Sequence, residues 1–162
     1  MVTPALFKKF PNPEKMSQAS QAEMEEALKS INFFRNKAKS LISMSSKLHR
    51  DHSGEVPREL EQLTALAGVG RKTANVVLGN AFNIPSGVVV DTHVARLSQR
   101  FGWTKHKQPE RIEVELQKLI DKEDWILISH LLIFHGRKVC SARKPLCASC
   151  FLVDQCPKKG VQ

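Results

Sequence analysis

The stretch that decides the fold reads Leu66-Ala67-Gly68-Val69-Gly70-Arg71-Lys72-Thr73-Ala74. Its two glycines let the backbone turn sharply between two helical patterns. We expect the first helix to open at Pro57 and to run through Leu66, and the second to continue from Arg71 to about Ala81. The stretch therefore predicts a helical hairpin at about residues 58–81.

The turn of this hairpin has the chemistry of an anion-binding site. The N-terminus of a helix presents unpaired N–H groups at its positive end, and Arg71 adds a charge there. In a chain with a net charge of +9 the natural anion is a DNA phosphate, and on this interpretation Gly68, Val69, Gly70 and Arg71 contact it. A glycine that merely caps the first helix also explains a bare Gly-x-Gly, so the motif alone leaves both interpretations open.

Helical patterns run through almost all of the chain before Cys140. Helices are expected to begin at Asn12-Pro13, at the capping box of Ser20 and Glu23, before the amphipathic run Phe34 to Leu48, at Asp91 or Thr92, at Gln108-Pro109 and at Trp125. The last of these, residues 125–135, is apolar on most sides and is expected to be buried. The one β-like run, residues 88–90, is too short to form a sheet. The sequence thus predicts an all-α fold.

The charge of the chain points to a polyanionic partner. The 162 residues include 25 Lys and Arg against 16 Asp and Glu, which leaves a net charge of +9. A hydrophobic share of 41% and a charged share of 25% exclude the collagen-like and disordered classes. The excess of positive charge favours nucleic acid as the partner over an anionic membrane surface, although solubility alone would also explain it.

Two features argue against export and against a membrane partner. Lys8 and Lys9 are not followed by the apolar region of a secretory signal. The longest apolar run, residues 125–134, is interrupted by Ser129 and His130 and is too short to cross a bilayer. We expect a cytoplasmic protein, associated with the nucleoid if the source is a bacterium.

The four cysteines lie close together, at Cys140, Cys147, Cys150 and Cys156. Two disulfides would suit a secreted chain, but nothing indicates export, so a metal site is favoured. Structural zinc sites usually contain two Cys-x-x-Cys pairs, and this chain has one. Four thiolates so near in sequence can wrap one [4Fe–4S] cubane, although zinc also accepts four thiolates. We expect a helical domain over residues 1–133 and a metal-binding loop region over residues 134–162.

The hairpin stretch and its continuation Asn75-Val76-Val77-Leu78 resemble the helix-hairpin-helix of the endonuclease III family of DNA repair glycosylases. The resemblance continues through Val90-Asp91-Thr92-His93 and His135-Gly136-Arg137 to the spacing Cys-x6-Cys-x2-Cys-x5-Cys, and covers nearly the whole chain. It implies the helix-hairpin-helix DNA glycosylase fold and a [4Fe–4S] cluster on the four cysteines. It also implies a monomer whose partner is double-stranded DNA with a damaged pyrimidine or an abasic site.

Lys72 lies just inside the second hairpin helix. An isolated lysine there would most simply contact a phosphate. Cleavage of a base from its sugar needs instead an amine that is neutral often enough to attack C1′, which nearby positive charge such as Arg71 favours. The resemblance implies that Lys72 is the nucleophile of a bifunctional glycosylase and AP lyase, which removes oxidised pyrimidines and cleaves the abasic site through a Schiff base and β-elimination. Monofunctional relatives that excise adenine lack this lysine.

Asp91 suits the N-cap of the helix that follows it. A fixed carboxylate can also stabilise the positive charge that builds on the sugar as the glycosidic bond breaks, and it can accept a proton from the lysine. The resemblance implies that Asp91 is the catalytic aspartate, and the two roles are compatible. His93 is expected to support the structure, while residues 135–137 supply packing and DNA-facing charge.

Two cations lie in the loop between Cys140 and Cys147. Arg143 and Lys144 are candidates for a second phosphate contact, or for solvated counter-charges to an anionic cluster.

Family members begin with helices that have no counterpart here, including part of the barrel and a glutamine-containing turn that fills the gap left by the flipped base. We therefore expect an incomplete barrel and transfer no gap-filling role to Gln18 or Gln21.

Two other function classes stay open at this point. One is a non-catalytic or inactive, truncated helix-hairpin-helix DNA-binding protein. The other is a monofunctional mismatch DNA glycosylase, against which Lys72 argues.

Overall fold

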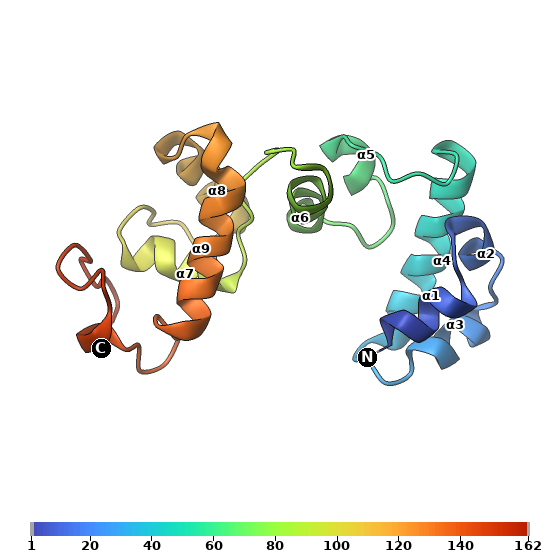
Figure 1. The fold of residues 1–162 in the computed structure, drawn as a ribbon, viewed down its shortest axis with the longest axis horizontal. Coiled ribbons are helices and arrows are strands. Elements are labelled where there is room, and N and C mark those ends of the chain that lie inside the picture. Colours follow the sequence, from blue (N-terminus) through green and yellow to red (C-terminus); the bar gives the residue numbers. More distant parts are fainter. Residues whose placement is uncertain (1, 162) are drawn as a thin grey trace. The chain divides into compact units, whose positions relative to one another are not determined.

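The computed structural model describes residues 2–161, and its regular structure in that part of the chain is entirely helical (Figure 1). The helices are α1 (Thr3–Lys9), α2 (Pro13–Ser17), α3 (Gln21–Leu28), α4 (Phe34–Asp51), α5 (Leu60–Thr64), α6 (Arg71–Phe82), α7 (Thr92–Arg100), α8 (Pro109–Leu119) and α9 (Trp125–Lys138), with short 3-10 turns η1 (Lys122–Asp124) and η2 (Cys147–Ser149). The predicted all-α fold is therefore confirmed. None of the described helices is long and apolar enough to cross a membrane.

The chain divides into two compact units, residues 1–74 and 75–162, with the boundary inside α6. Each unit has a hydrophobic cluster of its own. The sequence predicts a different division, between a helical domain over residues 1–133 and a metal-binding loop region over residues 134–162. That division stays a prediction.

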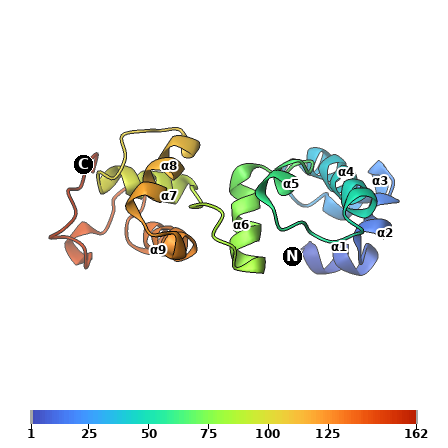
Figure 2. The same cartoon turned by 90° about the horizontal axis from the view of Figure 1, so that it is seen from above.

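The first unit gathers α1 to α4 around Leu6, Phe10, Met16, Met24, Leu28 and Ala38 (Figure 2). Side-chain caps start α2 and α3 as expected. The side chain of Asn12 accepts the Lys15 N–H at 2.9 Å, and Ser20 and Glu23 form the predicted capping box. Hydrogen bonds from the Ser20 backbone and hydroxyl lower the pKa of Glu23, which keeps this cap ionised.

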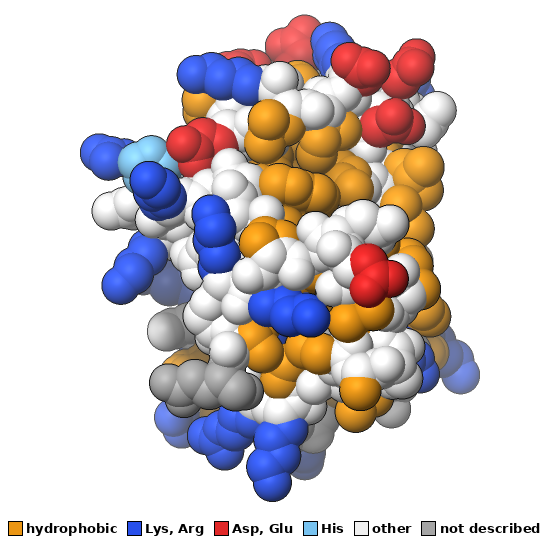
Figure 3. Space-filling view, turned by 90° about the vertical axis from the view of Figure 1, so that its left-hand side faces the viewer, with side chains coloured by type: hydrophobic (Ala, Val, Ile, Leu, Met, Phe, Trp, Pro, Cys, Tyr) orange, Lys and Arg blue, Asp and Glu red, His pale blue; other side chains and the backbone are white. Residues whose placement is uncertain are grey.

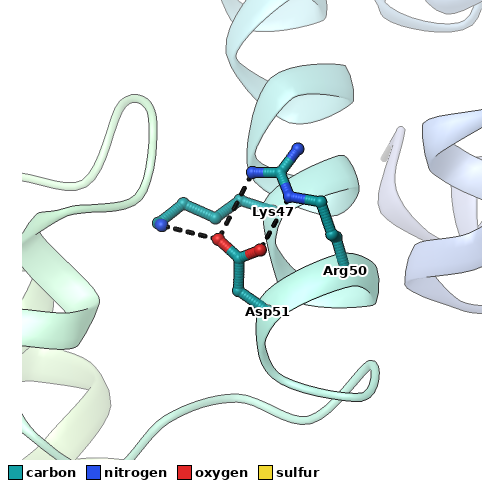
Figure 4. A network of polar contacts seen from close by, with 3 residues as sticks. All are labelled: Lys47, Arg50 and Asp51. Carbon is teal, nitrogen blue, oxygen red and sulfur yellow. Dashed lines mark hydrogen bonds and ion pairs between the residues drawn. The ribbon is translucent and has the colours of Figure 1, made fainter.

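The C-terminal end of α4 carries a small charge network (Figure 4). The Asp51 carboxylate accepts a hydrogen bond from Arg50 Nε at 2.7 Å and one from Lys47 Nζ at 2.8 Å. The bond from Arg50, followed by the bond from Lys47, holds the pKa of Asp51 well below its usual range. A carboxylate at the negative end of a helix is unfavourable by itself, so the two cations offset that cost.

The second unit packs α7, α8 and α9 around Val88, Val90, Val94, Leu97, Ile112, Leu116 and Leu132. The run of valines at residues 88–90 forms no strand and is instead a buried segment without regular secondary structure. Its backbone is anchored because the Val89 N–H donates to Ser129 Oγ at 2.9 Å. This segment leads directly into Asp91, so the core fixes the start of α7.

The expectation that the helix at residues 125–135 is buried on most sides is wrong. Leu127, Leu131 and Phe134 of α9 expose 52, 54 and 66% of their surface. Within the second unit α9 packs against α7 and η1, which cover one side of it. Figure 3, which faces the left-hand side of Figure 1, shows hydrophobic side chains gathered on that face of the molecule. Composition indicates what a helix can bury, whereas the number of neighbouring elements decides what it does bury.

A buried polar network clamps the loop between α6 and α7. Asn75 Nδ2 donates to Glu113 Oε1 at 3.1 Å, and Ser86 Oγ donates to Asn75 Oδ1 at 2.9 Å. Gly87 is packed against this network so closely that a Cβ there would collide with Glu113 Oε1 and lie 2.7 Å from Asn75 Nδ2. Glu113 is only 5% exposed, so its carboxylate cannot swing into solvent to make room.

We expect Gly87→Ala to lower the free energy of unfolding of the second unit by about 2–3 kcal/mol, since the added methyl breaks buried hydrogen bonds or displaces the loop. Both tryptophans, Trp103 and Trp125, lie in this unit, so denaturant unfolding followed by tryptophan fluorescence reports on it. The control is Gly70→Ala, where a Cβ meets nothing within 4 Å. Unfolding of Gly87→Ala at the wild-type denaturant concentration would contradict the clamp.

Candidate functional site

The predicted hairpin consists of α5, a short turn and α6. Its α5, its turn and the start of α6 belong to the first unit, and the rest of α6 belongs to the second. Leu63 and Leu66 are buried. The predicted bounds of the first helix are wrong, because α5 covers only Leu60–Thr64. Glu59 is extended, with φ −120° and ψ 140°, so the segment that holds Pro57 is not helical. Gly68 is left-handed, with φ +78°, and a Cβ there would lie 2.9 Å from Ser40 Cβ.

The turn presents the start of α6 to solvent. The Gly70 carbonyl accepts the Ala74 N–H at 3.0 Å, which places Gly70 at the N-cap. The N–H groups of the first helical turn lack acceptors within the helix and lie at its positive end. Gly68, Gly70 and Arg71 are exposed and Val69 is half-buried, so this surface is open to an anion.

Lys72 and Asp91 lie in different units of the chain. Lys72 is the second residue of α6 and is exposed. Asp91 is half-buried, and its Oδ1 accepts the backbone N–H groups of His93 at 2.8 Å and Val94 at 2.9 Å. The predicted N-cap role of Asp91 is therefore confirmed, and the carboxylate is held in one orientation.

The four cysteines are half-buried and line a single pocket of the second unit. Within residues 2–161, no group of three or more His, Cys, Asp or Glu side chains is close enough to hold one metal ion. Four cysteine thiolates are a ligand set that zinc and a [4Fe–4S] cluster both accept, so these residues form a candidate metal centre.

Two arginines of α7, Arg96 and Arg100, hold the start of the cysteine loop. Arg96 donates to the carbonyls of Gly136 at 2.9 Å and Cys140 at 2.8 Å. Arg100 donates to Cys140 Sγ at 3.0 Å. Burial and then the charge of Arg100 lower the pKa of Arg96. Sequence reasoning missed both roles, and the available signal was two arginines at i and i+4 in a helix that contains no acidic residue.

The motif at residues 135–137 packs beside the same pocket. The His135 ring lies 6.5 Å from the Phe101 ring and 5.6 Å from the Phe151 ring, and its Nε2 is 3.7 Å from Cys150 Sγ. Burial lowers the pKa of His135. Gly136 is buried, whereas Arg137 is exposed.

Arg143 and Lys144 stand on an exposed turn of the cysteine loop. Lys144 is left-handed, with φ 53°, and the Ser141 hydroxyl donates to the carbonyls of Arg143 at 2.6 Å and Lys144 at 3.2 Å. The turn therefore directs two cations to solvent.

Comparison with known proteins agrees with this architecture. Residues 1–122 match the model of the HhH-GPD superfamily, base excision DNA repair proteins. Endonuclease III of Synechocystis sp. is 52% identical over 156 residues, which cover 96% of this chain and 71% of that protein. Two solved structures, a non-covalent endonuclease III–DNA complex and a trapped endonuclease III–DNA covalent intermediate, are each 40% identical with a TM-score of 0.90, and the match covers 97% of this chain and 73 and 74% of theirs. The chain therefore belongs to the HhH-GPD superfamily of base excision DNA repair proteins, within its endonuclease III family.

Proposed function

We propose that this protein is a bifunctional DNA glycosylase and AP lyase that removes oxidised pyrimidines from duplex DNA and cleaves the abasic site. The observation that carries the proposal is Lys72 in the first turn of α6, directly after a glycine turn, in a chain 40% identical to an endonuclease III that was trapped covalently on DNA. A covalent enzyme–DNA bond requires a nucleophile, and a primary amine is the group that forms a Schiff base with a sugar.

In the proposed reaction the neutral Lys72 Nζ attacks C1′ of the damaged nucleotide. The C1′–N bond breaks, and the base leaves with the electron pair and takes up a proton. The C1′–O4′ bond then opens to give an imine between Lys72 and the sugar. Loss of a C2′ proton expels the 3′ phosphate, and water finally releases the lysine. Because Lys72 is exposed in the free chain, the bound DNA must supply its water-poor surroundings.

Asp91 has two tasks in this scheme. Its carboxylate accepts the proton that Lys72 loses, and it stabilises the positive charge that develops on the sugar. The backbone N–H groups of His93 and Val94 hold Oδ1 in place, so no reorganisation is needed when that charge appears.

In the proposed complex, backbone groups and cations of the protein hold the DNA at two sites. Gly68, Val69, Gly70 and Arg71 bind one phosphate at the start of α6. Arg143 and Lys144 bind a second phosphate from the exposed turn of the cysteine loop.

Cys140, Cys147, Cys150 and Cys156 are proposed to bind a [4Fe–4S] cluster, which the pocket that they line supports. Glycosylase and lyase steps transfer no electrons, so the cluster would have no redox role in the reaction. When bound, it would act as a rigid anchor that folds the loop. Zinc is the alternative metal, and iron and sulfide analysis of the purified protein distinguishes the two.

Borohydride trapping tests the proposed activity. The protein is incubated with a duplex that contains one oxidised pyrimidine, and borohydride is added to reduce any imine to a stable amine. We expect a covalent protein–DNA adduct together with strand cleavage at the lesion. Base release without an adduct would indicate a monofunctional glycosylase. Binding without base release would indicate a non-catalytic DNA-binding protein, and either result would overturn the proposal.

A further inference from the structure

We propose that Arg100 is the fixed counter-cation of the Cys140 sulfur, and that it sets the reduction potential of the metal cluster and keeps Cys140 bound to it. The inference rests on the proposed cluster. Arg100 is a positioning residue in this role, because it acts through the cysteine and touches neither DNA nor the reacting sugar.

The side chain of Arg100 grips the beginning of the cysteine loop. Its Nη1 donates to Cys140 Sγ at 3.0 Å and to the Ser141 carbonyl at 2.8 Å, and its Nη2 donates to the Ala142 carbonyl at 3.0 Å. One planar guanidinium thus binds three consecutive residues, a geometry that a lysine ammonium cannot reproduce.

The backbone of Arg100 holds the other end of the same loop. Its carbonyl accepts the Lys159 N–H at 3.0 Å, three residues after Cys156. A single residue at the C-terminal end of α7 therefore fastens the chain both at the first cysteine and beyond the last one.

The charge of Arg100 points to an anionic sulfur. The side chain is 7% exposed, and its acceptors within residues 2–161 are one sulfur and the carbonyls of residues 140–142. A buried guanidinium without an anionic partner is costly, and among these acceptors the sulfur is the one that would carry negative charge as a cluster ligand. Of the four cysteines, Cys140 alone has a described hydrogen bond to a guanidinium.

The direction of the effect follows from charge. Reduction adds an electron to a cluster that four thiolates already make anionic, so a cation 3.0 Å from one ligand sulfur stabilises the reduced form. Removal of Arg100 should therefore make the reduction potential more negative. Loss of the hydrogen bond should also free the Cys140 corner, so that the cluster is lost faster in air.

The experiment compares Arg100→Met, Arg100→Lys and Arg143→Met with the wild type after anaerobic purification. Arg143 is exposed in the same loop, so its variant changes the net charge equally without touching Cys140. Iron and sulfide content is measured first, then the midpoint potential by voltammetry and the decay of the cluster absorbance in air. We expect a lower potential and a several-fold faster decay for Arg100→Met, a smaller change for Arg100→Lys and no change for Arg143→Met.

The outcomes separate this inference from the proposed cluster. A wild-type protein that contains zinc, or no iron and sulfide, would refute the cluster itself. A loaded Arg100→Met protein with the wild-type potential would overturn the role of Arg100. If Arg100→Met takes up no cluster while Arg143→Met does, retention of Cys140 is supported, and the potential of Arg100→Lys then tests the electronic effect.

Discussion

Lys72→Ala is expected to abolish the covalent adduct on damaged DNA and to lower the rate of strand cleavage by about a thousandfold or more. The reason is chemical, because alanine has no nitrogen that can attack C1′ or form the imine, and removal of a catalytic nucleophile commonly costs at least that factor. The Lys72 side chain is exposed, so the free energy of unfolding should change by less than about 0.5 kcal/mol.

The measurement is single-turnover cleavage of a lesion-containing duplex, followed by borohydride trapping. Arg71→Ala is the matched control, since it removes the neighbouring cation and leaves the amine. It should weaken DNA binding and reduce the salt dependence of that binding, yet at saturating protein it should still form the adduct. Equal adduct yields from Lys72→Ala and the wild type would show that another group is the nucleophile.

Local interactions could be predicted because the two partners lie only a few residues apart in the sequence. Asn12, Ser20 and Asp91 all cap helices through N–H groups two or three residues away. Such caps depend on residue type and backbone conformation alone. The cysteine spacing is similarly local, and the four sulfurs do line one pocket.

The features that escaped prediction depend on contacts between distant residues. Arg100 and Cys140 are 40 positions apart, and Asn75 and Glu113 are 38 apart. The spacing of the arginines in α7 indicates that they need partners, but nothing in the sequence of either pair identifies the distant partner. The exposure of Leu131 on α9 was missed for the same reason, because the covering neighbours of a helix cannot be read from its own pattern.

Asp91 combines a local role with a proposed chemical one, and two substitutions separate them. Asparagine caps a helix about as well as aspartate, since its amide oxygen can accept the same N–H groups of His93 and Val94. Asp91→Asn should therefore keep the free energy of unfolding within about 0.5 kcal/mol of the wild type. Asp91→Ala loses the cap and should be destabilised by about 1 kcal/mol.

Activity is expected to follow a different order from stability. Asparagine and alanine both lack the negative charge that is proposed to stabilise the sugar and to accept a proton from Lys72, so both variants should release the damaged base about 100-fold or more slowly. Single-turnover base release and tryptophan-monitored unfolding of the two variants provide the comparison. If Asp91 only caps α7, Asp91→Asn will retain wild-type activity. If Asp91→Asn and Asp91→Ala lose activity equally but differ in stability, the activity requires the negative charge of Asp91, which the helix that it caps holds in place.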